Sequence, residues 1–275
     1  MESQLSFEFF PPKTKKGPAA LLRTAEQLNK RNPAFFSVTY GAGGSTREGT
    51  FNAVQSLRSN GFNTAPHLSW GGEGADSIVD LINQYKRIGV DRMVALRGDI
   101  PSEVSARKDV HYAEELVRLI RANFDHSLHL EVAAYPEVHP DASSPEEDIN
   151  YLKVKVDAGA NSCITQYFYN SDSYFYFVDR CRKKQITVPI VPGIMPITNY
   201  EGLVRFSNNC GAEVPRWIRL RLEALNDDQA ALQEFGVEVV TDLCRALLQG
   251  GAPGLHFYTL NNGGPTEAIV RNLSL

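Results

Sequence analysis

The sequence predicts an α/β protein with a (β/α)8 TIM-barrel fold, formed as a single domain over residues 1–275, and three observations support this prediction. Short runs rich in β-branched and aromatic residues alternate with longer amphipathic segments along the whole chain. No composition break or Pro/Gly/Ser-rich linker interrupts the alternation, which favours one parallel sheet covered by helices. The β-rich runs number eight, which is the number that closes such a barrel. An open doubly wound sheet is the alternative.

The eight predicted strands are LSFEFF, AFFSVTY, TAPHLSW, RMVALRG, LEVAAYP, CITQYFY, VPIVPGI and LHFYTL. Segments between them, such as PAALLRTAEQLNK and SIVDLINQYKRIG, carry apolar residues at helical spacing. Capping boxes are predicted for two helix starts, one from Ser144 and Glu147 with Pro145 in the first turn, and one from Ser45 and Glu48. The long stretch between the last two runs, including PRWIRLRLEAL, predicts extra helices before the last strand.

Composition favours small-molecule partners. The net charge is -4 and the charged residues are interspersed, so we expect neither a nucleic acid nor a membrane as partner. The four cysteines are far apart and form no CxxC pair, which argues against a disulfide framework or a zinc site. The N-terminal residues lack the charge and apolar run of a signal peptide, and no apolar run reaches the roughly 18 residues of a membrane span. A cytoplasmic protein is expected.

A glutamate stands among phenylalanines in the first predicted strand, LSFEFFPP. Side chains alternate along a strand, so Phe7 and Phe9 face the helices and Glu8 faces the barrel interior. Pro11 and Pro12 cannot continue the ladder, which places Glu8 near the C-terminal mouth. Because an unpaired carboxylate is costly there, Glu8 is a candidate functional residue.

Polar residues also end the other predicted strands, and barrel enzymes build their active sites at this end. We expect a carboxyl half buried among aromatic groups, with a second carboxylate across the mouth, to have a raised pKa and to act as a general acid near neutral pH. Glu8 and Asp99 form the natural pair. The other residues at strand ends are Thr39, Tyr40, His67, Arg97, Tyr135, Glu137, His139, Gln166 and Tyr258.

Other chemistries find less support. No lysine ends a strand, since Lys13 follows the prolines, so a Schiff-base aldolase is disfavoured. His67, His139 and His256 lie on separate runs without a metal-site signature. Neither a GxGxxG nor a GxxxxGK[ST] loop is present, and the RGD tripeptide follows a buried-strand pattern, which argues against an adhesion motif.

Several of these residues, taken one at a time, also fit a purely structural role. His67 and Tyr258, each taken alone, are more often packed in a core than used as ligands. The common position of His67 and Tyr258 at strand ends is what favours a functional interpretation. Asp148 and Lys155 lie on one predicted helical face with Tyr151 and Leu152, which fits a solvated stripe with an ordinary salt bridge.

Eight segments occur in the order SFEFFPPKT, FSVTYGAGGST, APHLS, ALRGD, AAYPEVHP, KVDAGANSCITQYFY, VPGIMPI and HFYTLN. From about residue 5 to residue 262, the chain thereby resembles methylenetetrahydrofolate reductase of the bacterial type. The resemblance implies a flavin-dependent barrel that reduces 5,10-methylenetetrahydrofolate to 5-methyltetrahydrofolate, with NADH or NADPH reducing bound FAD in a ping-pong cycle. It also implies a homo-oligomer.

The resemblance implies a role for each residue at a matching position. Glu8 becomes the acid that protonates the folate, Asp99 lies near flavin and pterin, and Gln166 hydrogen-bonds the pterin, with Tyr258 also at the substrate. The implied FAD-binding residues are Thr39, His67, Arg97, Gly98, Asp99, Tyr112, Ala113, Tyr135, His139, Ala142, Asp148 and Lys155.

Four positions depart from the pattern of the family. Tyr151 and Val154 stand where asparagine and arginine would face the FAD diphosphate. Asn262 stands where an arginine would hold substrate, and Leu222 replaces a phenylalanine in a loop that would stack on nicotinamide or folate. These departures leave two alternatives open: a relative that transfers hydride from nicotinamide without flavin, and a non-catalytic folate-binding barrel. The choice between NADH and NADPH and the need for a partner subunit are left open.

Overall fold

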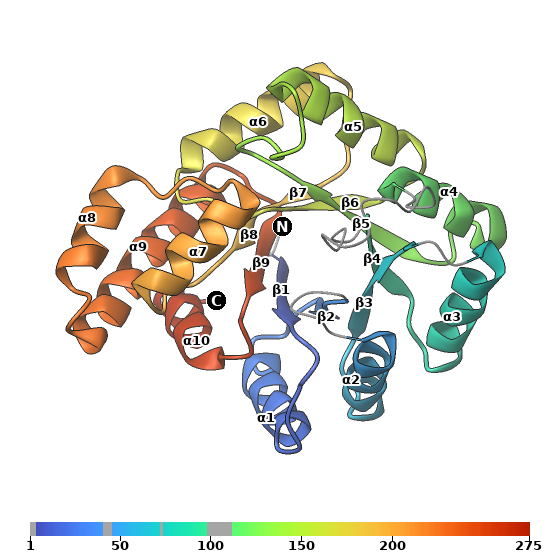
Figure 1. The fold of residues 1–275 in the computed structure, drawn as a ribbon, viewed down its shortest axis with the longest axis horizontal. Helices are drawn as coiled ribbons and strands as arrows, with labels where there is room; N and C mark the ends of the chain where they lie inside the picture. The colour runs from blue at the N-terminus through green and yellow to red at the C-terminus, as the bar shows by residue number, and fades with distance from the viewer. Residues whose placement is uncertain (1–3, 41–45, 72–73, 98–111) are drawn as a thin grey trace.

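The computed structural model describes residues 4–40, 46–71, 74–97 and 112–275, and these form a parallel, nearly closed barrel of strands surrounded by helices (Figure 1). The predicted (β/α)8 TIM-barrel fold is confirmed. None of the helices within the described ranges is long and apolar enough to cross a membrane. The strands are β1 (Gln4–Phe9), β2 (Phe35–Val38), β3 (Thr64–Ser69), β4 (Arg92–Leu96), β5 (His129–Ala134), β6 (Ser162–Thr165), β7 (Ile190–Val191), β8 (Gly193–Ile194) and β9 (Gly254–Tyr258).

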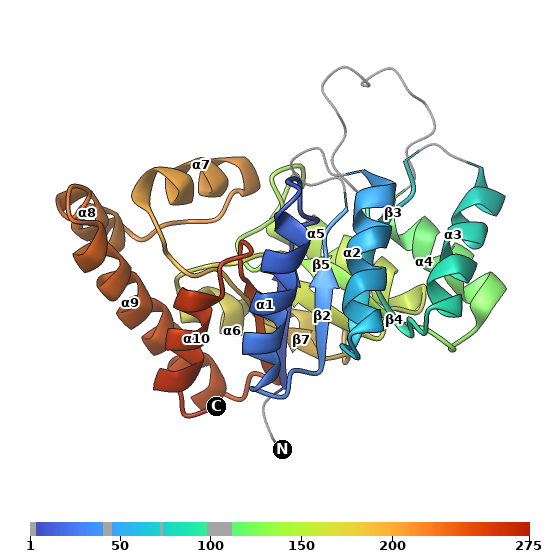
Figure 2. The same ribbon diagram turned by 90° about the horizontal axis from the view of Figure 1, so that it is seen from below.

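Helices follow most of the strands and cover the outside of the barrel (Figure 1). Figure 2 shows the extra helices α7, α8 and α9 set to one side of the ring, before the last strand as predicted. The helices are α1 (Gly17–Asn29), α2 (Arg47–Ser59), α3 (Ala75–Arg87), α4 (Ala113–Phe124), α5 (Pro145–Asp157), α6 (Ser171–Lys183), α7 (Tyr200–Cys210), α8 (Arg216–Ala224), α9 (Gln229–Gln249) and α10 (Gly263–Asn272).

The predicted seventh strand is divided at Pro192. The segment before it, β7, pairs with β6, and the segment after it, β8, pairs with β9. Proline has no amide hydrogen to donate, but its carbonyl oxygen accepts a hydrogen bond from His256 N, 3.0 Å away. The ring therefore closes through two short segments, which raises the strand count from the predicted eight to nine.

The predicted helix caps are partly correct. Ser144 Oγ accepts a hydrogen bond from Glu147 N at 3.2 Å, as expected, but the Glu147 carboxylate reaches back to Ser143 N rather than to Ser144 N. Ser45, the predicted cap of α2, lies outside the described residues, and the cap in the structure is Thr46, one residue later, whose Oγ1 accepts from Gly49 N at 3.0 Å. Both helices begin within one residue of the predicted place because a short side chain caps their first turn.

Two apolar layers pack on the two faces of the strands. Phe7 and Phe9 are fully buried against other aromatic rings on the outer face, beneath the helices, as alternation predicts. A smaller layer fills the barrel interior with Phe35, Ala65, Val94 and Ile164. This inner layer leaves the polar side chains near the ends of the strands to form separate clusters.

Candidate functional site

Glu8 points into the barrel, where two imidazoles meet one of its oxygens. His256 Nε2 from β9 lies 3.4 Å from Oε2 in a hydrogen bond. His67 Nε2 from β3 lies 3.2 Å from the same oxygen, but it is not aligned for a hydrogen bond. The Glu8 side chain is only 12% exposed. The inward placement predicted from alternation is therefore confirmed.

The expected rise in the pKa of Glu8 is wrong. Burial does raise this pKa, but the charge of His67 and the hydrogen bond from His256 outweigh it and lower the pKa from 4.5 to about 2. The histidines come from strands that are distant in sequence, and the pairing of β1 with β9 and, through β2, with β3 brings them to the carboxylate. Glu8 is therefore a carboxylate at neutral pH in the free protein.

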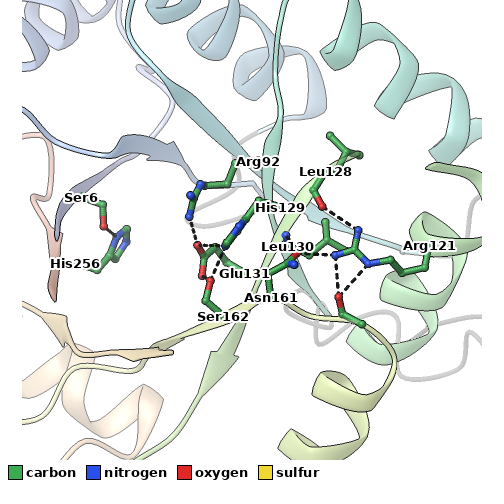
Figure 3. A network of polar contacts seen from close by, with 11 residues as sticks. Ser6, Arg92, Arg121, Leu128, His129, Leu130, Glu131, Asn161, Ser162 and His256 are labelled. Carbon is green, nitrogen blue, oxygen red and sulfur yellow. Dashed lines mark hydrogen bonds and ion pairs between the residues drawn. The ribbon is translucent and has the colours of Figure 1, made fainter. Parts of the chain in front are cut away.

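The imidazole of His256 is packed between polar and aromatic side chains. Its Nδ1 lies 2.7 Å from Ser6 Oγ, a contact visible in Figure 3, and the residue is completely buried. Its ring stacks on Phe35 with centroids 5.9 Å apart and meets the edge of Tyr258 at 5.4 Å. The sequence prediction did not propose Ser6 or His256 as site residues, although each lies two positions from a proposed one and so shares its face of the strand.

The remaining residues predicted at the mouth have different surroundings. Tyr258 donates its hydroxyl hydrogen to the Thr165 carbonyl oxygen, 2.6 Å away, and the Gln166 side-chain oxygen accepts from Tyr167 N at 3.0 Å. Ser37 Oγ and Thr39 Oγ1 are buried and have no hydrogen-bond partner within the described residues. Because Ser37 is the strand-register partner of Glu8, these two hydroxyls lie near the carboxylate and are available to a ligand or water.

A cleft of about 570 Å³ opens at the C-terminal ends of β4 and β5, beside α4 and α5. Its volume lies in the range of small-molecule and cofactor sites. Thr39 and His67 lie at the barrel mouth rather than in this lining, and Gly98 and Asp99 lie outside the described residues. Eight residues of the predicted cofactor set line the cleft, namely Arg97, Tyr112, Ala113, Tyr135, His139, Ala142, Asp148 and Lys155.

Lys155 and Asp148 lie one above the other on α5, facing the cleft. Lys155 Nζ donates to the Ala133 carbonyl oxygen at 2.5 Å, and burial lowers the pKa of this lysine. Asp148 Oδ2 accepts from His139 N at 3.0 Å, and burial raises the pKa of this carboxyl. In the described structure no ion pair joins the two, so the interpretation as an exposed salt bridge is wrong.

The outer part of the cleft is built around Asp141, which the sequence prediction did not propose. Arg97 Nη2 donates to Asp141 Oδ2 at 2.7 Å. Asp141 N in turn donates to His139 Nδ1 at 3.0 Å, and the His139 ring packs edge-on against Tyr135 with centroids 4.4 Å apart. The cleft therefore combines aromatic surface, two cationic side chains and a half-buried carboxylate.

The four residues that depart from the family pattern have different surroundings in the structure. Tyr151 lines the cleft and donates its hydroxyl hydrogen to Glu147 Oε1 at 3.0 Å, while Val154 on the same helix is 38% exposed. Leu222 is fully buried in α8, so the expectation that it lies in a stacking loop is wrong. Asn262 caps α10 by accepting from Gly264 N at 3.3 Å.

The chain resembles proteins of known sequence and structure along nearly its whole length. The family model for methylenetetrahydrofolate reductase matches residues 1–274. The chain is 38% identical to 5,10-methylenetetrahydrofolate reductase of Salmonella typhimurium, over 98% of this chain and 90% of that one. It is 37% identical to methylenetetrahydrofolate reductase (NADH) 1 of Zea mays, over 98% of this chain and 48% of that one.

A solved structure from Clostridium thermocellum shares the fold with a TM-score of 0.67 at 16% identity, over 98% of this chain and 93% of that one. It is described as binding two copies of 5-methyl-5,6,7,8-tetrahydrofolic acid. The full-length family match and the identity to the bacterial enzymes decide the relationship. The chain belongs to the methylenetetrahydrofolate reductase family and is an oxidoreductase of folate-dependent one-carbon metabolism.

Proposed function

We propose that the protein reduces 5,10-methylenetetrahydrofolate to 5-methyltetrahydrofolate by means of bound FAD, which NADH or NADPH reduces in a separate half-reaction. The observation that carries the proposal is the position of the cleft at the same rim of the barrel as Glu8. Leu96 lines the cleft and also packs on the apolar layer that fills the barrel interior. Tyr258 contacts the same layer and meets the ring of His256, the partner of Glu8, edge-on. A cofactor in the cleft and a substrate above Glu8 would therefore be neighbours.

The residues of the cleft fit FAD. Tyr135 and His139 offer aromatic surface, Lys155 and Arg97 offer positive charge to the diphosphate, and Asp148 offers an acceptor to a ribose hydroxyl. When bound, FAD supplies the hydride chemistry, and the protein supplies position and charge. Lys155 begins from a half-buried position beside the Ala133 carbonyl, so little side-chain freedom is lost when it binds an anion.

Glu8 is assigned the role of the acid that protonates the folate and opens its methylene bridge. The unpartnered hydroxyls of Ser37 and Thr39 are suited to hydrogen bonds with the polar edge of a pterin. The folate described in the Clostridium thermocellum neighbour supports a folate site on this kind of barrel. We further assign the protein to the cytoplasm as a homo-oligomer with small-molecule partners only.

An anaerobic visible absorbance trace tests the proposal. NADH, or NADPH if NADH has no effect, is expected to bleach the flavin bands of the purified protein, and methylenetetrahydrofolate is then expected to restore them. Steady-state rates at several fixed reductant concentrations should give parallel double-reciprocal lines, as a ping-pong cycle requires. Intersecting lines, or a flavin that bleaches and does not recover with folate, would contradict the proposed cycle.

A second candidate is direct hydride transfer from nicotinamide to folate without flavin. The observation that favours it is the pair Tyr151 and Val154 on α5, which offers no cation where the family has an arginine. A colourless protein that nevertheless oxidises nicotinamide in the presence of methylenetetrahydrofolate would establish this candidate. Binding of folate without turnover under either reductant would instead indicate a folate-binding barrel.

A further inference from the structure

The proposed reaction consumes a proton that Glu8 cannot hold by itself. Conversion of the methylene bridge to a methyl group by a hydride requires one proton on the folate nitrogen that leaves the bridge. The pKa of Glu8 lies at about 2, because the opposing histidines outweigh the effect of burial. At neutral pH the carboxylate must therefore receive this proton from a neighbour before it passes it on.

His256 has the geometry of that neighbour. Its Nε2 lies 3.4 Å from Glu8 Oε2, and its Nδ1 lies 2.7 Å from Ser6 Oγ. A serine hydroxyl accepts as well as donates, so Ser6 can accept from Nδ1–H while Nε2 either carries a proton or has given it up. The imidazole thus retains its hydrogen bond to Ser6 in both protonation states.

Among the residues that the structure describes, the other groups around His256 do not offer a competing partner for its Nε2 proton. Phe35 from β2 stacks on the ring and separates it from the Arg92 guanidinium, which lies 4.5 Å from the centroid of Phe35. Tyr258 meets the ring edge-on, but its hydroxyl donates to the Thr165 carbonyl oxygen. His67 from β3 is close to Glu8 but is not aligned for a hydrogen bond. Glu8 is therefore the carboxylate that faces Nε2.

We propose that His256 is the proton store for the folate half-reaction and that Ser6 fixes the orientation of its ring. This inference rests on the proposed function. The N–H bond at His256 Nε2 breaks as an O–H bond forms at Glu8 Oε2. Glu8 then gives this proton to the folate nitrogen, whose bond to the bridging carbon breaks with the electron pair on nitrogen. The carbon accepts the hydride. After the product leaves, a proton from solvent returns to Nε2 by way of the partly exposed Glu8 carboxylate. His256 is a positioning and proton-supplying residue that acts through Glu8.

The kinetic test compares three variants in rapid-mixing experiments on each half-reaction, between pH 6 and pH 9. His256→Gln retains an amide N–H near Glu8 but cannot store a proton, so the folate half-reaction should slow by about 100-fold or more and lose its dependence on pH over this range. Ser6→Ala should slow it by about 10-fold. Reduction by nicotinamide should stay within about 2-fold of wild type, because no proton store is needed there.

His129→Gln is the matched control. His129 also contacts a serine and a glutamate, Ser162 and Glu131, but it lies at the opposite end of the barrel. It should leave the pH dependence of the folate half-reaction unchanged. If His256→Gln keeps the wild-type rate and pH profile, the imidazole serves only as a hydrogen-bond donor and the proposal is overturned.

A second measurement is independent of turnover. Nitrogen chemical shifts of ¹⁵N-histidine report which ring nitrogens carry protons, and the chain has only six histidines to assign. At one fixed pH, Glu8→Gln should change the nitrogen shift of His256 Nε2, because this nitrogen loses its hydrogen bond to a carboxylate. An unchanged shift would overturn the proposal even if His256→Gln failed to fold. If wild type does not reduce the folate, the proposed function fails, and these shifts still show whether His256 and Glu8 share a proton.

Discussion

Lys155 Nζ donates a hydrogen bond to the carbonyl oxygen of Ala133, 2.5 Å away, and this contact holds a lysine of α5 against the end of β5. The lysine lines the same cleft as Asp148 and Tyr135. Burial lowers the pKa of Lys155, while the negative charge of Asp148 acts in the opposite direction. A cation held in this way has a fixed position and incomplete hydration, which makes it suited to an anionic ligand.

Replacing Lys155 should therefore weaken the binding of FAD. Lys155→Met removes the charge but keeps the apolar stem, and a charge-assisted hydrogen bond is worth about 1.5–3 kcal/mol, so the Kd should rise by roughly 10- to 100-fold. Titration of the apoprotein with FAD, followed by flavin fluorescence, measures the change. Lys153→Met is the control, because Lys153 pairs with Asp157 on the surface of the same helix. Equal effects of the two variants would contradict a local role for Lys155.

Restoring a cation at position 154 should strengthen FAD binding. Val154→Arg places a positive charge on α5 near the proposed diphosphate site, and at an exposed position such a charge contributes about 0.5–1 kcal/mol, or roughly 2- to 5-fold in Kd. The gain should decrease as salt is raised from 0.05 to 0.5 M. Asn150→Arg adds the same charge at an exposed position of the same helix and should give a smaller gain.

Removing the carboxylate of Glu8 should separate the two half-reactions. Glu8→Gln is expected to slow folate reduction by about 10²- to 10⁴-fold, since general acid catalysis contributes on this scale. Flavin reduction by the nicotinamide should change little, because it needs no proton transfer to folate. Stopped-flow absorbance measures both steps. Equal loss of the two would mean that Glu8 has a structural role.

The polar cluster at the N-terminal end of the barrel should contribute to stability in a pH-dependent way. Glu131 is buried and contacts Arg92, His129 and Ser162 (Figure 3). Burial raises the pKa of Glu131, but these partners outweigh burial and lower it below the ordinary value. A lowered pKa in the folded state means that the stabilisation is present above the unfolded-state pKa of about 4.3 and is lost as pH falls through the folded-state pKa.

We therefore expect Glu131→Gln to lower the free energy of unfolding by about 3 kcal/mol at pH 7, as measured by urea denaturation. The difference from wild type should shrink as pH falls below the unfolded-state pKa of about 4.3, where the carboxyl becomes protonated first in the unfolded chain, and it should vanish below the lower folded-state pKa. Asp157→Asn removes an exposed pair with Lys153 and should cost less than about 0.5 kcal/mol. A constant difference between Glu131→Gln and wild type across this pH range would contradict the assignment.

Closure of the barrel should depend on Gly193. A Cβ atom at this position would lie 2.1 Å from the Thr165 carbonyl oxygen and 2.6 Å from Cε2 of Tyr258, so β8 cannot keep its place beside β9. Gly193→Ala should lower the free energy of unfolding by about 3 kcal/mol and slow the folate half-reaction through displacement of Tyr258. Gly74→Ala, where nothing lies within 4 Å of the added atom, loses only the preference for glycine over alanine at the N-cap of α3 and should cost less than about 1 kcal/mol. Similar urea midpoints for the two variants would show that the barrel adjusts at residue 193.

The sequence predicted more of the cleft than of the cluster around Glu8. Arg97, Tyr135, His139, Asp148 and Lys155 were identified by motif and do line one cleft. Asp141 was not identified, because a surface aspartate in a loop has no pattern of its own until Arg97 is seen to bind it. The capping serine and proline of α5 were correct because caps depend on adjacent residues only.

By itself the sequence determined the βα alternation, the inward direction of Glu8 and the family of the chain, because each depends on periodicity or on local motifs. The tertiary structure decided the charge of Glu8 and the division of the seventh strand at Pro192. The pKa of a buried carboxyl depends on which groups lie within a few ångströms, and His67 and His256 reach Glu8 only when β3 and β9 take their places beside β2 and β1 in the sheet. Periodicity specifies the face on which a side chain lies, whereas the pairing of strands distant in sequence specifies its neighbours on that face.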